Sequence, residues 1–139
     1  MNDPQKEALA KIGHPKHLDK LVHDNSGLIR EAVARSGNDS HKDILMHDDL
    51  PDVRELVAEY GSDKHRDHLI NDHKPSVRAA VAYKGNDNHK DYLMNDESSY
   101  VRGVVAKHGN KKHAKYLLMD NTASVSKLAE ERLEELGVK

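Results

Sequence analysis

The sequence contains no cysteine, no phenylalanine and no tryptophan. Apart from histidine, its aromatic residues are therefore five tyrosines. The lack of cysteine excludes disulfides, thiolate metal sites and iron–sulfur clusters. Only 36% of the 139 residues are hydrophobic, while 33% are charged. A compact globule of this length normally needs a larger apolar core with aromatic residues. A solenoid needs less, because each repeat buries only one face against each neighbour.

Long hydrophobic runs are also lacking. The N-terminal MNDPQKEALAKIG has no apolar segment of signal-peptide length, and no stretch approaches the length of a membrane span. We therefore expect a soluble, cytoplasmic protein that does not associate with membranes. The net charge of −2 argues against a globally basic nucleic-acid binder.

A period of 24 residues runs through the chain, and four kinds of position follow it. The repeated positions are Ile29-Arg30, Val53-Arg54, Val77-Arg78 and Val101-Arg102; Gly13, Gly37, Gly61, Gly85 and Gly109; His17, His41, His65, His89 and His113; and Asp24, Asp48, Asp72, Asp96 and Asp120. A fixed period of this length indicates a solenoid of stacked repeats. We predict an all-α, right-handed superhelical solenoid that forms a single repeat domain over 1–139.

Each repeat is expected to form a helix, a turn, a shorter helix and a second turn. In 77–84 the apolar residues recur at helical spacing, which places Val81 in the core. Gly85 follows where a left-handed C-cap residue is expected. The second helix, over 89–95, buries Leu93 and is about two turns long, so part of it is expected to be 3₁₀.

The period also sets the boundaries of the repeats. They are 4–28 for an N-terminal repeat, 29–52, 53–76, 77–100 and 101–124 for four full repeats, and 125–139 for a C-terminal segment. In that last segment Ser126 replaces the arginine and Leu133 replaces the glycine. LAEERLEELGVK is therefore expected to continue as one longer capping helix, which suggests that the chain is complete.

The repeated residues resemble a known family. The D-x5-R segment followed by Val-Ala, as in Asp72 to Arg78 and then Val81-Ala82, together with a leucine in the second helix, resembles the leucine-rich repeat variant. That resemblance implies an α-helix alternating with a 3₁₀-helix in a curved superhelix. The same segment is similar to HEAT-type repeats, in which Asp and Arg at this separation hydrogen-bond into a ladder. The resemblance implies a fold more than a function, because such folds host many unrelated partners.

Four Asp–Arg pairs, each six residues apart, span the loop before each first helix. They are Asp24/Arg30, Asp48/Arg54, Asp72/Arg78 and Asp96/Arg102. We interpret them as a structural ladder in which an arginine binds a carboxylate near the N–H groups of a helix start. A catalytic role would not need four copies.

The five periodic histidines suggest metal binding, but their spacing argues against it. Stacked helices lie about 8–10 Å apart, whereas Zn–N bonds are about 2.0–2.1 Å, so stacked histidines cannot share one ion. We interpret them as neutral groups that tie a turn to the neighbouring repeat. The weak metal candidates are His65, His68 and Asp72, with His14 and His17 as a second cluster. We expect no metal and no cofactor.

No catalytic motif is present. His65-Arg66-Asp67 has the letters of the kinase catalytic loop, but the same slots read His41-Lys42-Asp43 and His89-Lys90-Asp91, so the triplet belongs to the repeat. The sequence has no nucleophile elbow, P-loop or dinucleotide fingerprint. We predict that the protein is not an enzyme.

The positions that differ between repeats are the remaining candidates for function. Four of the five tyrosines gather in the last two full repeats, and tyrosine is enriched in interface hot spots. The alternative is that these rings cover core edges, which tyrosine also does. The predicted partner-binding residues are Tyr83, Tyr92, Tyr100, Tyr116 and Lys107. They predict an adaptor or inhibitor that docks on a larger protein or complex.

A basic row supports a second hypothesis, in which the chain binds nucleic acid. The row consists of Lys42, Arg66, Lys90 and Lys112. Cations at repeat spacing suit phosphates along a backbone. However, Asp43, Asp67 and Asp91 lie beside the row, and mixed charge on a helix is typical of an ordinary solvated face.

Overall fold

The computed structural model describes residues 1–138, and this range folds into helices and turns with no β-strand. The longer helices are α1 (Asp3–Ile12), α3 (Gly27–Ser36), α5 (Pro51–Tyr60), α7 (Pro75–Lys84), α9 (Ser99–His108) and α11 (Ala123–Glu135). The shorter ones are α2 (Pro15–Leu21), α4 (Asp39–Leu45), α6 (Asp63–Leu69), α8 (Asp87–Leu93) and α10 (Lys111–Leu117). None of the helices in this range is long and apolar enough to cross a membrane.

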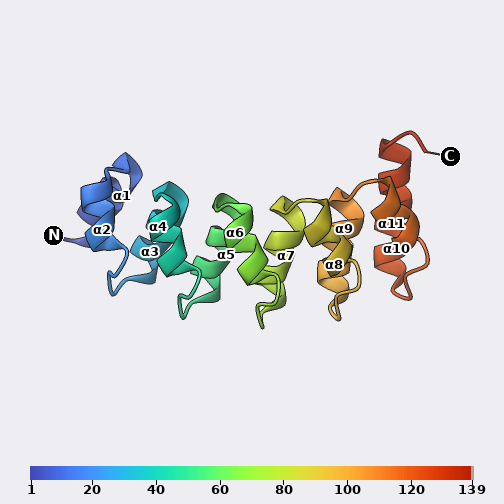
Figure 1. Cartoon of the computed structure of the whole chain (residues 1–139), viewed down its shortest axis with the longest axis horizontal. Coiled ribbons are helices and arrows are strands. Elements are labelled where there is room, and N and C mark those ends of the chain that lie inside the picture. The colour runs from blue at the N-terminus through green and yellow to red at the C-terminus, as the bar shows by residue number, and fades with distance from the viewer. Residues whose placement is uncertain (139) are drawn as a thin grey trace. The chain divides into compact units, whose positions relative to one another are not determined.

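Long and short helices alternate along the chain (Figure 1), and each long helix begins 24 residues after the previous one. The prediction of an all-α solenoid is therefore confirmed, while the handedness of the superhelix stays a prediction. The short helices are α-helices of seven residues. Their last turn tightens into a 3₁₀-type bond, as where the Asp48 N–H donates to the Leu45 carbonyl at 3.0 Å.

The chain divides into two compact units, Met1–Leu69 and a second one from Ile70 onward. In the first unit α1, α3 and α5 pack in sequence as one layer, and α2, α4 and α6 each pack against the long helix that precedes them. In the second unit α7, α9 and α11 form the layer of long helices, and α8 and α10 contact the long helices on either side of them in the chain. Each unit therefore has one layer of long helices and one of short helices.

Small aliphatic side chains make up the core. The fully buried residues in the two predicted core slots are Val33, Val57, Val81 and Val105 in the long helices and Leu45, Leu69, Leu93 and Leu117 in the short ones. An alanine follows each of these valines and is also inaccessible to solvent. Small side chains at these positions allow neighbouring helices to approach closely, so the core packs densely without phenylalanine or tryptophan.

The glycine after most long helices has an extended backbone, and the prediction of a left-handed cap is wrong there. The φ angles are −74° at Gly37, −69° at Gly85 and −76° at Gly109, whereas Gly13 is left-handed with φ 75°. The need for glycine at Gly85 is steric instead. An added Cβ would lie 2.5 Å from the Val81 carbonyl oxygen and 2.7 Å from Nδ1 of His89.

Replacing Gly109 by alanine should therefore destabilise the protein by about 2–3 kcal/mol, because its Cβ would lie 2.6 Å from the Val105 carbonyl oxygen and 2.7 Å from Cβ of His113. Gly103→Ala is the matched control. It lies within α9, where an added Cβ meets ordinary contacts of 3.4 Å or more, and the same slot of α7 holds Ala79. This control should stabilise the protein by about 0.5–1 kcal/mol. Urea unfolding followed by circular dichroism measures both changes, and equal effects at the two glycines would contradict the steric explanation.

Candidate functional site

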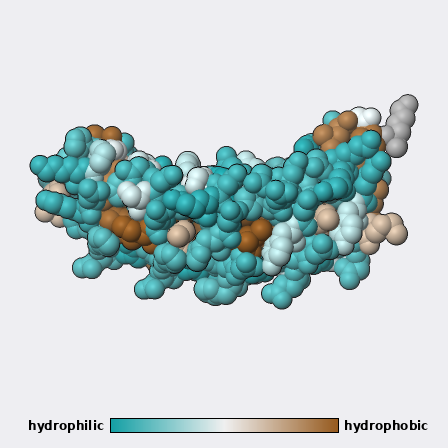
Figure 2. All heavy atoms as spheres, in the orientation of Figure 1, coloured by the Kyte–Doolittle hydropathy of each residue, from teal (hydrophilic) through white to brown (hydrophobic). Residues whose placement is uncertain are grey.

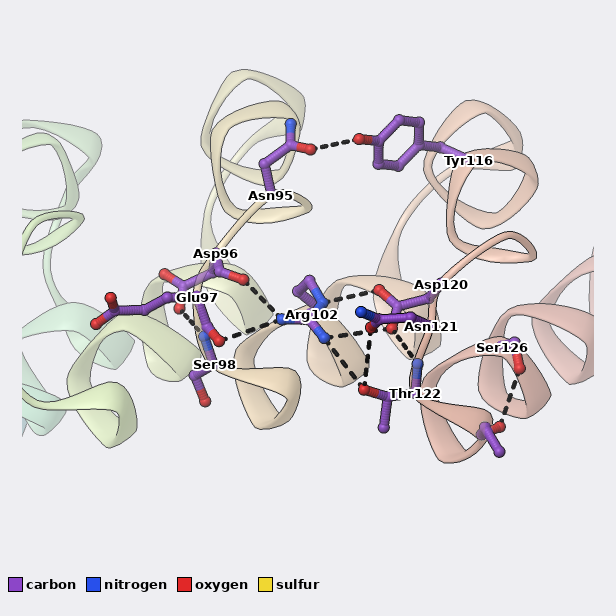
Figure 3. A network of polar contacts seen from close by, with 11 residues as sticks. Asn95, Asp96, Glu97, Ser98, Arg102, Tyr116, Asp120, Asn121, Thr122 and Ser126 are labelled. Carbon is purple, nitrogen blue, oxygen red and sulfur yellow. Dashed lines mark hydrogen bonds and ion pairs between the residues drawn. The ribbon is translucent and has the colours of Figure 1, made fainter.

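Arginines in the long helices join the loop before their own helix to the loop before the next long helix. Nε of Arg102 donates to Oδ2 of Asp120 at 2.7 Å and its Nη2 donates to Oδ1 at 3.3 Å, while Nη1 donates to the Asp96 carbonyl oxygen at 2.8 Å (Figure 3). Arg30 makes the same three kinds of bond with Asp48 and with the Asp24 carbonyl. Arg78 makes them with the Asp96 carboxylate and the Asp72 carbonyl. The guanidinium fork thus connects the loop just before its own helix to a carboxylate 18 residues further on, in the loop before the next long helix.

The predicted pairing of an aspartate carboxylate with the arginine six residues later is wrong in register. Arg30 binds the carboxylate of Asp48, and only the backbone oxygen of Asp24. The Asp24 carboxylate binds Nζ of Lys6 at 2.8 Å, and Lys6 occupies the arginine slot of the first repeat. Arg54 likewise donates to the Asp48 carbonyl at 2.7 Å.

The loop conformation explains the shift in register. One carboxylate oxygen of each periodic aspartate accepts the N–H two residues later, as where Thr122 donates to Asp120 at 2.9 Å and Ser98 donates to Asp96 at 2.8 Å. This local turn holds each carboxylate where the preceding arginine reaches it. The hydrogen bonds from Arg102 hold the pKa of Asp120 below its usual value, although burial opposes this effect. Asp24 has a lowered pKa because Lys6 and the Ser26 N–H bind it.

The periodic histidines are N-terminal capping groups of the short helices. The Asn110 N–H donates to Nδ1 of His113 at 3.0 Å, and the His113 N–H donates to Oδ1 of Asn110 at 3.1 Å. The other members of this arrangement are Asn38 with His41 and Asn86 with His89, and Ser62 donates its N–H to His65 in the same way. Histidine therefore occupies the place that glutamate or glutamine holds in an ordinary capping box.

The second ring nitrogen of these histidines reaches the preceding repeat. Nε2 of His113 lies 2.6 Å from Oδ1 of Asp91. Nε2 of His65 lies 2.8 Å from Oδ1 of Asp43, and Nε2 of His41 lies 2.7 Å from Oδ1 of Asp19. Because a backbone N–H can only donate, Nδ1 must be the acceptor and Nε2 must carry the proton. The geometry agrees with the interpretation of neutral groups that tie a turn to a neighbouring repeat, at His41, His65 and His113.

His17 does not make these bonds. It is exposed, and His14 caps α2 instead through Nδ1, which accepts the Lys16 N–H at 3.2 Å. The rings of His14 and His17 lie 5.5 Å apart.

The weak metal candidates have other roles in the structure. Both ring nitrogens of His65 are hydrogen-bonded, so neither offers a free lone pair to a metal. The ring of His68 lies edge-on to His47 at 4.7 Å, and Asp72 accepts the Lys74 N–H. Within residues 1–138 no group of three or more His, Cys, Asp or Glu residues is arranged to hold a metal ion.

The basic row predicted to track phosphates is largely buried. Lys42 and Lys90 are only 5% and 7% exposed, and Arg66 is also mostly covered. Nζ of Lys90 donates to the Gly85 carbonyl at 2.6 Å, Nζ of Lys42 donates to the Gly37 carbonyl, and Nε of Arg66 donates to the Ala58 carbonyl at 2.8 Å. These cations satisfy carbonyl groups at the ends of the long helices. Lys112 is exposed and pairs with Asp91 at 2.7 Å, so the four residues do not form one exposed row.

Arg132 replaces this cation where the repeat lacks it. The slot holds Ala114 in the last pair of helices, and Nε of Arg132 in α11 donates to the Gly109 carbonyl at 2.8 Å. This role of Arg132 was not predicted from the sequence. The sequence feature that indicates it is Ala114, which occupies a position that three preceding repeats fill with lysine or arginine.

The predicted partner-binding tyrosines belong to two layers of helices. Tyr92 and Tyr116 lie on short helices, where their hydroxyl groups donate to Oδ1 of Asn71 and Asn95 respectively (Figure 3 shows the second pair). Tyr83 and Tyr100 lie on the long helices α7 and α9. All four tyrosines are between 48% and 63% exposed, so each side chain is available on one side.

A groove of about 440 Å³ lies between α9 and α11, and apolar surface predominates in it. The residues that line it include Tyr100, Val104, Lys107, His108 and Leu128. The Tyr83 ring lies edge-on to His108 with centroids 4.6 Å apart, which extends the groove toward α7. We call Tyr83 and these five residues the groove face. Figure 2 shows hydrophobic residues gathered in separate patches on a largely hydrophilic surface.

Replacing His113 by phenylalanine should destabilise the protein by about 2–3 kcal/mol, because a flat ring without nitrogen leaves the Asn110 N–H without its acceptor. His17→Phe is the control at the same slot, where the histidine is exposed and caps nothing, and it should change stability by less than about 0.5 kcal/mol. Urea unfolding of both variants measures the difference. Similar losses at the two positions would contradict the capping role.

Acid should weaken the Arg102–Asp120 link. A lowered pKa in the folded state contributes stability that is complete above the unfolded value of about 3.9 and is lost as the pH falls through the folded value. Asp120→Asn should cost about 2 kcal/mol at pH 7, because a charge-assisted pair of bonds is lost. The difference in unfolding free energy between the two proteins should shrink as the pH falls below 4. Urea titrations across this range test this, and a constant difference down to pH 2 would count against it.

The comparisons with known proteins support the fold. No protein-family model matches the sequence, and no curated protein matches it. Among solved structures, the chain is similar to one described as a leucine-rich repeat variant with a novel repetitive protein structural motif, at a TM-score of 0.73 and 26% sequence identity. The match covers 84% of this chain and 50% of that one, so the chain spans about half the length of the solved structure. The helical-repeat fold is thus similar to that of a leucine-rich repeat variant, while the likeness to HEAT-type repeats stays a prediction.

Proposed function

We propose that this chain is a non-enzymatic scaffold that binds another protein through the groove face of its second unit. A helical-repeat fold supports a role in interactions, because stacked repeats present a continuous surface to a partner. The observation that carries the proposal is the apolar groove between α9 and α11, with Tyr100 63% exposed at its edge.

The repeated polar residues favour the groove face by elimination. The periodic arginines, aspartates and most of the histidines hold the repeats together, as Arg102, Asp120 and His113 illustrate. The groove face, in contrast, is built from slots that differ from repeat to repeat. Tyr83, for example, corresponds to Glu59 and to Lys107. Specificity in a solenoid is expected where the repeats differ.

The chemistry of the groove face also suits a protein partner. Exposed tyrosines beside an apolar groove are typical of interface hot spots, where a ring buries a large area at low entropic cost. Gly103, at the floor of the groove, has no side chain to fill it. We propose that the partner is a larger protein or complex, which the chain recruits as an adaptor or blocks as an inhibitor.

The test is affinity capture from the lysate of the native host, with the wild-type chain and single variants immobilised side by side. Tyr100→Ala and Leu128→Ala remove side chains of the groove face, so each should reduce retention of the partner at least about tenfold, which corresponds to about 1.4 kcal/mol. Tyr92→Ala and Tyr116→Ala are matched controls, because those rings are similarly exposed but lie on the short helices. Quantitative mass spectrometry of the retained proteins measures the changes.

One protein that the wild type and both controls retain, and that both groove variants lose, would support the proposal. Loss in the control variants alone would move the interface to the short helices and refute the groove face. A parallel arm with nuclease distinguishes the remaining class of partner. If nuclease abolishes every retained species, the chain acts on nucleic acid and the proposed function is wrong.

A further inference from the structure

Lys107 places a positive charge on the groove face. Lys107 and His108 line the groove, whose lining contains no aspartate or glutamate. The long helices α7 and α9, which carry Tyr83 and Tyr100, contain no acidic residue, whereas α5 contains Asp52, Glu55 and Glu59. The glutamates of α11 all follow Leu128 in the chain, and Glu135 acts on His108 more weakly than the nearby cations do. Around the groove, positive charge therefore predominates.

Some lysines of the described chain form an ion pair with an aspartate, whereas those near the groove do not. Lys6, Lys64 and Lys112 each form an ion pair with an aspartate at 2.7–2.9 Å. In the part of the chain that the structure describes, no ion pair involves Lys84, Lys107 or Lys127. Nζ of Lys84 instead lies 5.3 Å from the centre of the Tyr83 ring.

His108 is partly buried, and most of the charges that act on it are positive. Burial lowers its pKa most, and the positive charges of Lys107, Arg132 and Lys90 lower it further, against a smaller opposing effect of Glu135. A neutral imidazole at the edge of the groove adds no charge that would repel an apolar side chain. The groove thus combines an apolar floor with a cationic rim.

We infer that the occupant of the groove is a peptide segment in which one large apolar side chain is flanked by aspartate or glutamate. This inference rests on the proposed function and names the chemistry of the partner at the same surface. The apolar side chain enters between Val104 and Leu128, and the flanking carboxylates meet Lys107 and Lys84, which have no acidic partner in the described chain. Complementary charge of this kind sets orientation and suppresses wrong partners.

The test uses a fluorescein-labelled synthetic peptide with one phenylalanine between runs of aspartate and glutamate, titrated with the full chain and followed by fluorescence anisotropy. About 0.1 M salt keeps the Debye length near 10 Å, so nearby charges still act. Lys107→Glu should weaken binding at least about tenfold, because it reverses the charge at the rim. Lys115→Glu on α10 is the control, since it makes the same change in net charge at an exposed position of the short-helix layer. Replacing the phenylalanine of the peptide by alanine should weaken binding to a similar extent.

Equal weakening by Lys107→Glu and Lys115→Glu would mean that the peptide senses only net charge, and it would overturn the inference. The same holds if the alanine peptide binds as well as the phenylalanine peptide, if a version with lysine in place of the acids binds equally, or if no peptide binds. These results leave the proposed function intact when capture from lysate still depends on Tyr100 and Leu128. If that dependence fails while the acidic peptide binds as expected, the groove is a peptide site but the proposed protein partner is wrong.

Discussion

The bidentate bond from a long-helix arginine to the aspartate before the next long helix is the interaction on which the stacking depends. It joins two stacked long helices through a guanidinium whose third nitrogen also holds the loop before its own helix. Both partners are largely buried, with side chains 14% and 7% exposed for Arg102 and Asp120. Removing one partner of such a pair leaves a charge without compensation, which costs far more than the intact pair contributes. The spacing of the repeats is therefore sensitive to these residues.

Polar connections of this kind explain how the chain folds with so little apolar material. The core slots hold valine, leucine and alanine, and each helix buries only one stripe of them. The neutral histidines add a second set of bonds between repeats, since one ring nitrogen caps a helix and the other reaches back to an aspartate. The cations at the helix ends satisfy carbonyl groups that would otherwise be left without a donor. In the last pair of helices this need is met from α11 by Arg132, which shows that the carbonyl, not the sequence slot, determines where a donor is required.

Much of the fold was predictable from the period, and much of the polar network was not. Residues at equal slots have equal surroundings, so the helices and the core residues Val81 and Leu93 followed directly from the repeat. The period does not show which neighbour a side chain reaches. An aspartate six residues before Arg30 and one 18 residues after it occupy the same slot of a 24-residue repeat, so sequence alone could not separate Asp24 from Asp48. Likewise, the sequence suggests that Lys90 on its short helix is exposed, because it does not show that the Gly85 carbonyl lies within reach of Nζ.

The same limitation explains why the candidate surface was only partly predictable. The period placed Tyr83 on a first helix and Tyr92 and Tyr116 on second helices, but it could not show that Tyr100 and Leu128 line one groove. The core, the helix caps and the bonds between repeats determine most residues of each repeat. Few exposed positions are therefore left that can vary. In the second unit α7 and α9 contain no acidic residue, and Gly103 lines the same groove as the exposed Tyr100. Stacking requires neither the apolar groove nor its cationic rim, whereas the proposed recognition of a partner would account for both.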